Sequence, residues 1–474
     1  MMGENDLNSE RVKQLSTDKE TNMQETITYL NHWRAAQSPD EVAYYYQVDD
    51  RFQPLTYREN QTLTTNLAMG LADLGVEKGD RVAIVSGTRA EWFQFDSAIL
   101  NIGGIVVGIY PTSTAAQMGY ILDHSETRVV VVEDKTQFEK IASLEPATLE
   151  KIIVIDSDGM VPGGWLTLDE CATQGKMLLA QQPDLPAERR AAVQPEDMAT
   201  LIYTSGTTGL PKGVVMRHNN LVNIAQSVAE FLDLDSDDVG ITYLPLAHSL
   251  QRLTSYVGTA VGMTGYFLSD ITKLVETSKQ VQPTALAAVP RIYEKIHSAI
   301  MAGLEKAPPR RRQFMQNGLA AGEAYARCQR QNKPVPFLLK LKHAFYERLL
   351  YCKIRAALFG SRMSYLSSGA APISPDLLAF FDGVGLPIYE GYGLTETTSP
   401  ITLNRPGDVK FGTVGRPLPG SQVKIANDGE ILLKGPGVFT EYYKNPTATR
   451  HAFTADGWFC SGDIGELDED GYLR

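Results

Sequence analysis

The sequence predicts an α/β fold in which two helix-covered sheets of mostly parallel strands are followed by a small β-rich unit. Short apolar runs that end in turns alternate with segments of helical length, a pattern typical of parallel strands connected by helices. From residue 412 onward, short strands punctuated by glycine and proline indicate the β-rich unit. The 474 residues exceed the roughly 250–300 at which a single hydrophobic core stops growing, so several units are expected.

The first predicted unit spans residues 23–190 and follows a flexible leader, residues 1–22. Residues 57–74 carry apolar side chains at helical spacing and stop at Gly75, and residues 90–102 predict a second helix. The apolar runs that predict buried strands in this unit are residues 81–86, 128–133 and 151–156. A polar segment that contains proline, residues 181–197, separates this unit from the next.

The second predicted unit spans residues 191–411, and the third spans residues 412–474. In the second unit, a helix is expected at residues 219–232, and strands are expected at 199–203, 240–244 and 285–289. Residues 301–355 form a long, basic segment of helical character within it. In the third unit, strands are expected at residues 421–425 and 430–434.

The overall composition favours an ordinary globular enzyme: 43% of the residues are hydrophobic and 21% are charged. The net charge of -12 argues against broad binding of nucleic acid, while leaving room for a local basic site. The N-terminal segment has no apolar core of a signal peptide, and the apolar stretch 98–110 is too short for the ~20 residues of a membrane span. A cytoplasmic protein is expected, with membrane association and a homodimer left open.

The four cysteines are widely scattered and form no pair with the spacing of a metal site or of a redox motif. Reduced thiols are therefore expected, as in a protein of the cytosol. The cysteines are Cys171, Cys328, Cys352 and Cys460.

The most informative segment is the loop of residues 203–213, Tyr-Thr-Ser-Gly-Thr-Thr-Gly-Leu-Pro-Lys-Gly, which follows a predicted strand. Hydroxyl groups, glycines that let backbone amides approach an anion, and one lysine together predict a phosphate site. The spacing differs from that of a Walker A loop. The residues expected to bind phosphate are Thr204, Ser205, Gly206, Thr207, Thr208, Gly209 and Lys212.

This string resembles the signature of the adenylate-forming superfamily, which includes acyl-CoA synthetases, luciferases and the adenylation domains of peptide synthetases. The resemblance implies the fold of the large N-terminal domain of acyl-CoA synthetases, with ATP, Mg²⁺ and coenzyme A as cofactor and substrates. Lys212 and Thr204 are then expected to act in catalysis. Further motifs of the superfamily follow in its order, so the resemblance covers residues 56–474.

Residues 389–398, Tyr-Glu-Gly-Tyr-Gly-Leu-Thr-Glu-Thr-Thr, resemble the second ATP motif of the superfamily. There Tyr392 is expected beside the adenine, Thr395 at the phosphate, and Glu396 as a catalytic ligand of Mg²⁺ together with Thr204. A hard cation that bridges phosphates suits a carboxylate beside hydroxyl groups. The remaining residues of this motif expected near ATP are Glu390, Gly391 and Gly393.

Two other segments resemble nucleotide motifs. The turn of small residues that passes the adenine is similar to residues 368–372, with contacts expected from Gly369, Ala370, Ala371 and Pro372. In residues 458–465, Trp-Phe-Cys-Ser-Gly-Asp-Ile-Gly, Asp463 is expected to accept hydrogen bonds from the ribose.

Three stretches are similar to the long-chain fatty acyl-CoA synthetases within the superfamily: residues 289–296, the helical insertion 301–355, and residues 89–93 with 104–112. Residues 243–252 resemble the segment with a mobile aromatic residue near the acid's carboxylate, so His248 is expected among the catalytic residues. Burial rewards an acyl chain by ~0.8 kcal/mol per methylene, so small and apolar side chains suffice to line a tunnel. The expected lining is His248, Val257, Gly258, Val261, Gly262, Val289 and Tyr293, although the apolar members fit ordinary core packing equally well.

The resemblance implies that a long-chain fatty acid is converted to acyl-AMP with release of pyrophosphate, and that coenzyme A then displaces AMP. The superfamily performs both steps with a C-terminal lid that supplies a lysine. No such lid is expected here, because the sequence stops at residues 470–474, which are similar to the strand before the hinge. Two alternatives stay open: a fatty acyl-AMP ligase that loads a carrier protein, and a lid-less ATP- or lipid-binding module.

Overall fold

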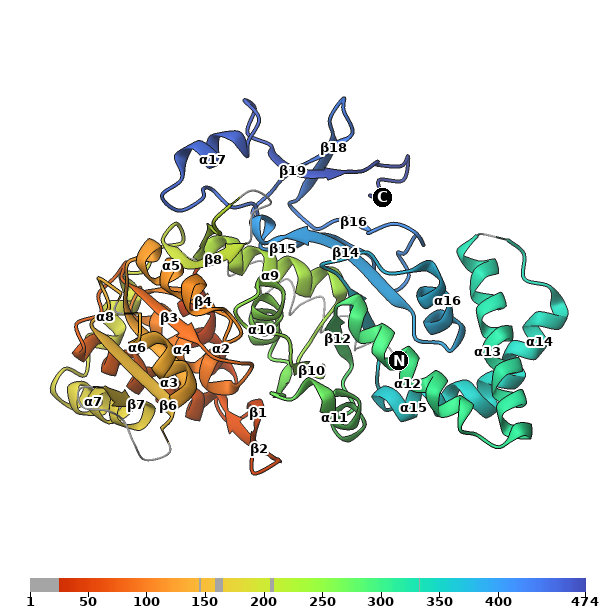
Figure 1. Ribbon diagram of the computed structural model, residues 1–474, viewed down its shortest axis with the longest axis horizontal. Coiled ribbons are helices and arrows are strands. Elements are labelled where there is room, and N and C mark those ends of the chain that lie inside the picture. The colour runs from red at the N-terminus through yellow and green to blue at the C-terminus, as the bar shows by residue number, and fades with distance from the viewer. Residues whose placement is uncertain (1–24, 145, 158–164, 205–208, 332) are drawn as a thin grey trace, which may run out of the picture.

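The computed structural model describes residues 25–144, 146–157, 165–204, 209–331 and 333–474. It has the predicted α/β architecture, with several mostly parallel sheets and helices packed on them (Figure 1). The expected leader, residues 1–22, lies outside the described residues, as do Ser205, Gly206, Thr207 and Thr208 of the phosphate loop.

The largest sheet has seven strands in the order β7-β6-β5-β3-β4-β8-β9, all parallel except β9. Alternate side chains of its strands face two different cores: Val82 and Ile84 contact one, Ala83 and Val85 the other. Continuous apolar runs form these strands because both faces are covered by helices. The strands are β3 (Arg81–Val85), β4 (Ile105–Ile109), β5 (Thr127–Asp134), β6 (Lys151–Asp156), β7 (Leu166–Thr167), β8 (Met198–Thr204) and β9 (Lys212–Arg217).

Helices from the first part of the chain cover this sheet. The first core includes side chains of α3 (Tyr57–Asp73) and α4 (Ala90–Asn101), and the opposite core includes those of α5 (Ala115–Ser125) and α6 (Lys135–Ala142). A capping box between Thr56 and Glu59 starts α3, and Gly75, with φ of 82°, follows its end. Further helices here are α7 (Leu168–Gln181) and α8 (Leu185–Ala191), the latter within the segment predicted as a polar linker.

A second group of strands forms two smaller sheets beside the first. The four-stranded sheet, β10-β11-β1-β2, joins the early hairpin β1 (Val42–Val48) and β2 (Arg51–Thr56) to β10 (Val239–Thr242) and β11 (Thr264–Phe267). The five-stranded sheet consists of β12 (Ala285–Ala288), β13 (Tyr365–Ser368), β14 (Ile388–Leu394), β15 (Ser399–Leu403) and β16 (Arg416–Pro417). Lying between the sheets are α2 (Ile27–Gln37), α9 (His218–Leu232) and α10 (Ser249–Val261) (Figure 1).

The basic segment predicted to be helical is a group of helices at one end of the molecule (Figure 1). The long helix α13 (Pro309–Arg330) packs closely on α16 (Pro375–Gly383), because a Cβ atom on Gly322 would lie 2.5 Å from the carbonyl oxygen of Gly383. The other helices in and around this group are α11 (Leu274–Val281), α12 (Pro290–Glu305), α14 (Phe337–Tyr346), a π-helical turn (Glu347–Tyr351) and α15 (Cys352–Phe359).

The β-rich unit is a three-stranded antiparallel sheet with one helix, and it lies above the other layers in Figure 1. Its own small core includes Leu433, Phe439 and Phe459, and a bridge between Val214 and Tyr442 ties it to β9. Its elements are β17 (Gln422–Ile425), β18 (Glu430–Lys434), α17 (Pro446–His451) and β19 (Phe459–Ile464). Within the described ranges, no helix has both the length and the apolarity needed to cross a bilayer.

Candidate functional site

The phosphate loop connects the last two strands of the large sheet. Thr204, at the end of β8, is paired directly with Lys212, at the start of β9. Antiparallel pairing therefore places the hydroxyl-bearing residue and the cation side by side where the loop leaves the sheet. Both residues line a cavity of about 630 Å³, within the size range of small-molecule sites.

A carboxylate approaches this cation from another strand. β14 ends at Leu394 and is followed by a short 3₁₀ turn, Thr395–Thr397, that brings Thr395 and Glu396 to the same cavity. Tyr442 donates a hydrogen bond of 2.8 Å from its hydroxyl to Glu396 Oε1. Lys212 Nζ lies 4.9 Å from the centroid of the Tyr442 ring. Tyr442 belongs to none of the sequence motifs, so sequence reasoning missed it.

Tyr392 and Asp463 meet at the rim of the cavity. The Tyr392 hydroxyl, on β14, donates a 2.7 Å hydrogen bond to Asp463 Oδ2, on β19. Burial raises the pKa of Tyr392, so the phenol stays protonated and acts as the donor. The Asp463 side chain is exposed, and its neighbour Ser461 lines the cavity. The β-rich unit thus supplies an acceptor next to the aromatic ring expected at the adenine.

The turn of small residues follows β13 and also reaches the cavity. Gly369 and Ala370 line it, and Ala370 has a φ of 66°, a left-handed conformation that is uncommon for residues other than glycine. Ser368, before them, is 3% exposed, and its hydroxyl has no hydrogen-bond partner among the described residues. A buried polar atom that faces a cavity without a partner is suited to bind a ligand.

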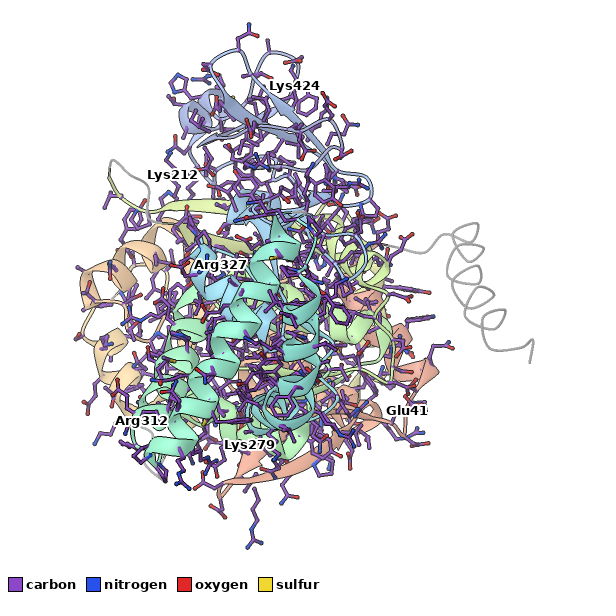
Figure 2. The ribbon with its side chains drawn as sticks, turned by 90° about the vertical axis from the view of Figure 1, so that its right-hand side faces the viewer. Glu41, Lys212, Lys279, Arg312, Arg327 and Lys424 are labelled. Carbon is purple, nitrogen blue, oxygen red and sulfur yellow. The ribbon has the colours of Figure 1, made fainter. Side chains whose placement is uncertain are left out.

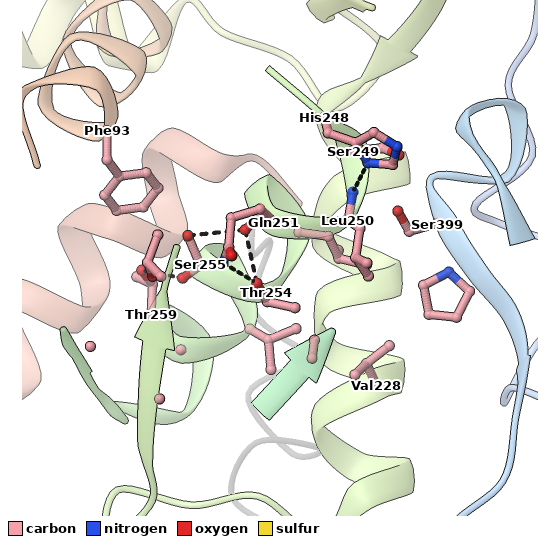
Figure 3. A pocket seen from close by; sticks show the side chains of 18 of the residues that line it. Phe93, Val228, His248, Ser249, Leu250, Gln251, Thr254, Ser255, Thr259 and Ser399 are labelled. Carbon is pink, nitrogen blue, oxygen red and sulfur yellow. Dashed lines mark hydrogen bonds between the residues drawn. The ribbon is translucent and has the colours of Figure 1, made fainter. Parts of the chain in front are cut away.

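His248 lies at the N-terminal end of α10 and lines the same cavity (Figure 3). Its Nδ1 accepts a 3.1 Å hydrogen bond from the backbone N–H of Leu250. Burial lowers the pKa of His248 below its ordinary value, which favours the neutral ring. Since Nδ1 is an acceptor, the proton of the neutral ring is on Nε2, and His248 can donate a hydrogen bond but is poorly placed to act as a base through Nδ1.

Comparison with known proteins assigns the chain to a family. The family described as "AMP-binding enzyme" matches residues 31–443, which is most of the chain. The chain belongs to the AMP-binding enzyme family. The resemblance seen in the sequence motifs is therefore confirmed.

Relatives of this AMP-binding enzyme carry consistent names. It is 38% identical to the long-chain-fatty-acid–CoA ligase FadD15 of Mycobacterium bovis and of Mycobacterium tuberculosis, over 92% of this chain and 71% of each relative. It is 31% identical to fatty acyl-CoA synthetase A of Dictyostelium discoideum, over 88% of this chain and 64% of the relative.

A solved structure confirms the fold predicted from the sequence. The inhibitor-bound N-terminal domain of FACL13 from Mycobacterium tuberculosis matches with a TM-score of 0.71 and 26% identity, covering 95% of this chain and 99% of that one. A putative long-chain-fatty-acid CoA ligase from Rhodopseudomonas palustris matches with a TM-score of 0.70 at 22% identity, covering 94% of this chain and 98% of that one.

From its mouth at Thr204, Lys212 and Glu396, the cavity of this AMP-binding enzyme continues into an arm between α9, α10 and the four-stranded sheet. This arm, called the apolar arm below for the side chains that can contact an acyl chain, is also lined by hydroxyl and amide groups of α10 (Figure 3). Of the residues expected to line an acyl tunnel, His248, Val257 and Gly258 line this cavity. A Cβ atom on Gly258 would meet its nearest neighbours at 3.9 Å, so the glycine leaves space there. Apolar side chains from several other elements complete the arm: Phe93, Val228, Leu232, Leu253 and Phe267.

The other expected acyl-lining residues lie elsewhere in the structure. Tyr293 is fully buried in the core of the five-stranded sheet and donates a 2.8 Å hydrogen bond to the carbonyl of Ser367. Val289 precedes α12 and packs against that same core. Gly262 ends α10 with a φ of 85° and lies beside the guanidinium group of Arg34. Val261, the residue before it, packs against the first core. These residues serve packing and helix termination.

The residues that are expected to bind the nucleotide also divide into those that line the cavity and those that do not. Gly391 and Gly393 line the cavity, whereas Ala371, Pro372 and Glu390 do not. Glu390 is partly buried, and burial raises its pKa to about 7 despite the opposing effect of Arg330. Gly209 lines a neighbouring cavity of about 330 Å³ that also contacts Lys212.

The metal chemistry of the site rests on few ligands. The part of the chain that the structure describes holds no cluster of three or more His, Cys, Asp or Glu side chains suited to a metal ion. Thr204 and Glu396, which do line the cavity, form a sparse set of oxygen donors. Such a set fits Mg²⁺, which keeps water and substrate phosphates as most of its ligands.

Proposed function

We propose that this enzyme activates a long-chain fatty acid with ATP to give acyl-AMP and then transfers the acyl group to coenzyme A. One observation carries the proposal: a single cavity joins a polar mouth at Thr204, Lys212 and Glu396 to an apolar arm that reaches Phe267. An acid and a nucleotide bound in one continuous cavity can meet at the junction between the two parts. The names of the relatives support the same substrate class.

The residues at the mouth have distinct proposed roles. Lys212 and the hydroxyl of Thr204 hold phosphate oxygens, the Tyr392 ring lies on the adenine, and Asp463 accepts from the ribose. Thr204 and Glu396 would hold Mg²⁺, which when bound neutralises negative charge on the phosphates. His248 would donate from Nε2 to a carboxylate oxygen of the acid and orient it.

The chemistry then depends on position and charge. A carboxylate oxygen of the acid attacks the α-phosphorus of ATP, and the bond from this phosphorus to pyrophosphate breaks in line. In the second step the coenzyme A thiolate attacks the acyl carbonyl, and the carbon–oxygen bond to AMP breaks. The protein contributes orientation and charge stabilisation to both steps, without a covalent intermediate on its own side chains.

Binding of stable acyl-AMP analogues tests the site without requiring turnover. Acyl-sulfamoyladenosines with chains of increasing length, from C8 to C18, would be titrated calorimetrically. Affinity should rise by up to about fourfold per methylene until the apolar arm is filled. Equal affinity for all chain lengths would show that the arm does not bind the acyl chain. If the analogues bind no more tightly than AMP alone, the proposal of an acyl substrate is wrong.

The acceptor is tested separately, because a carrier protein is the alternative to coenzyme A. ATP–pyrophosphate exchange with a panel of C8 to C20 acids measures the first step. Thioester formation is then compared between free coenzyme A and a phosphopantetheinylated carrier protein. Acylation of the carrier protein alone would contradict the proposal that coenzyme A is the acceptor. Tight binding of the analogue without ATP–pyrophosphate exchange for any of the acids would indicate a binding module.

A further inference from the structure

The outer face of α14 carries large apolar side chains in contact with solvent. Phe337 and Leu338 are 73% and 71% exposed, Leu341 and Phe345 are each 53% exposed, and Leu349 in the following turn is 40% exposed. Four of them recur every four residues, so they form one stripe along the helix. Apolar side chains are seldom gathered in this way on a soluble surface unless they bind something. These five residues are called the α14 face below.

The opposite side of α14 is firmly packed, which fixes the direction of the α14 face. The His343 ring stacks 4.0 Å from that of Tyr325 on α13, and the Tyr346 ring lies 5.1 Å from Phe314. Figure 1 shows α14 on the outer side of α13, at the end of the molecule away from the large sheet. The α14 face therefore points away from the body of the protein.

Basic side chains surround the α14 face. With 3.6 residues per turn, Lys340 and Lys342 lie about 100° to either side of Leu341. Residues 306–353 contain eleven lysines and arginines but only two glutamates, in a chain whose net charge is -12. Figure 2 views this end of the molecule directly, with Arg312 near one end of α13 and Arg327 near the other.

The ion pairs of this region leave the flanking lysines available. Arg327 and Arg330 pair with Asp376 and Asp382 on the side of α13 that faces α16. Arg355 pairs with Glu347 beyond the end of α14. Across the described residues, Lys340 and Lys342 form no ion pair, so their charges can meet an external anion.

We propose that the α14 face binds the surface of an anionic lipid bilayer, with α14 lying in the plane of the headgroups. Apolar side chains on one face and flanking lysines are the features of a helix that lies at a membrane interface, and anionic lipids attract each nearby basic side chain. The stripe from Phe337 to Leu349 is about 19 Å long, enough for a helix that rests on a membrane. The inference is independent of the reaction proposed above.

The charge distribution favours lipid over a second copy of the chain. In a twofold dimer through the α14 face, the same surface of both copies meets, so Lys340 and Lys342 of each copy face those of the other. Like charges brought together in this way oppose association. An anionic bilayer instead satisfies both the apolar stripe and its basic borders.

Co-sedimentation with vesicles tests the proposal. The whole chain is mixed with vesicles of phosphatidylcholine alone or with added phosphatidylglycerol. We expect binding to the anionic vesicles that weakens as salt rises. The double variant Leu341→Glu with Phe345→Glu should weaken partitioning at least about tenfold, and so should Lys340→Glu with Lys342→Glu.

Met177→Glu is the matched control, because Met177 is an equally exposed apolar residue (60%) on α7, far from α14 (Figure 1). Circular dichroism and urea unfolding establish that each variant is folded. The proposal is overturned if the chain ignores anionic vesicles or if Met177→Glu reduces binding equally. It is also overturned if sedimentation velocity shows a dimer that Leu341→Glu dissociates, since a second copy then covers the α14 face.

Discussion

The Tyr442 hydroxyl donates a 2.8 Å hydrogen bond to the Glu396 carboxylate, which links the β-rich unit to the turn after β14. Burial and the neighbouring Glu396 charge raise the pKa of Tyr442, so this phenol stays protonated and remains a donor. The Lys212 ammonium lies over the same ring. The carboxylate is therefore oriented toward the cavity before any ligand binds.

Replacing Glu396 with glutamine should remove the effect of Mg²⁺ on ATP binding. The amide oxygen can still accept the Tyr442 hydrogen bond, so the local fold is kept, but the negative charge that attracts the cation is lost. We expect the gain in ATP affinity on adding Mg²⁺ to fall at least about tenfold. Titration of ATP with and without Mg²⁺ measures it, and Glu294→Gln, on the exposed side of α12, is the control. An unchanged Mg²⁺ effect would contradict the assignment of Glu396.

Two substitutions distinguish the contribution of Asp463 to AMP binding from that of the Tyr392 hydroxyl. Asp463→Ala should weaken AMP binding about tenfold, through loss of hydrogen bonds to the ribose. Tyr392→Phe keeps the aromatic ring and removes only the hydroxyl that donates to Asp463. It should therefore change AMP affinity by less than about threefold. If Tyr392→Phe costs as much as Asp463→Ala, the carboxylate acts through Tyr392 rather than on the ribose.

Gly258→Leu should shorten the acyl chain that the enzyme accepts. Gly258 lines the apolar arm, and the space at its Cβ position would be filled by the leucine side chain. Affinity for the C16 acyl-AMP analogue should fall at least about tenfold, while affinity for the C8 analogue changes little.

The control for this substitution is Gly303→Leu. Gly303 is also within a helix, α12, and a Cβ atom there would have no neighbour within 4 Å. Both variants therefore gain the same intrinsic helix propensity. An equal loss for C8 and C16 analogues in Gly258→Leu would indicate general disruption of the site rather than a shorter arm.

Glu390 predicts a pH dependence of stability. Burial raises its folded-state pKa to about 7, and the ordinary value is 4.5. Between these values the folded protein keeps a proton that the unfolded chain releases, so the free energy of unfolding falls as pH rises from 4.5 through 7. Because glutamine does not ionise, Glu390→Gln should remove this fall in the free energy of unfolding. At pH 8 the variant should be more stable than the parent by on the order of 2 kcal/mol.

Urea unfolding of both proteins at pH 5 and pH 8 measures the difference. At pH 5 the parent carries a mostly protonated Glu390, and the two proteins should be of similar stability. A variant that is equally stabilised at both pH values would show that packing of the amide, rather than ionisation, is responsible.

Four strands of the large sheet, β3, β5, β6 and β8, could be predicted from the sequence, and so could Thr204, Lys212 and Glu396 at the mouth of the cavity. Each of these strands is a local apolar run. Thr204 is the last residue of β8, and Gly369 and Thr395 directly follow β13 and β14, at the carboxyl ends where open α/β sheets bind ligands. This rule brings together segments that lie almost two hundred residues apart in the chain.

Other features depend on contacts between distant segments and left no local signal. The hairpin of β1 and β2 is a weak strand pattern that is stabilised by β11, more than two hundred residues later. The strands β8 and β9 follow the predicted boundary at residue 190 but join the sheet before it. Tyr293 and Val257 are both apolar and helical, and only the packed structure shows that one fills a core and the other lines the cavity.

The walls of the cavity come from residues as far apart as Asn31 and Ser461. The complete cavity therefore requires the β-rich unit to be docked on the rest of the chain. A ligand that binds there recognises the fully assembled chain and stabilises every layer at once. Saturating acyl-AMP analogue should accordingly protect amides in the large sheet and in the β-rich unit alike from hydrogen exchange.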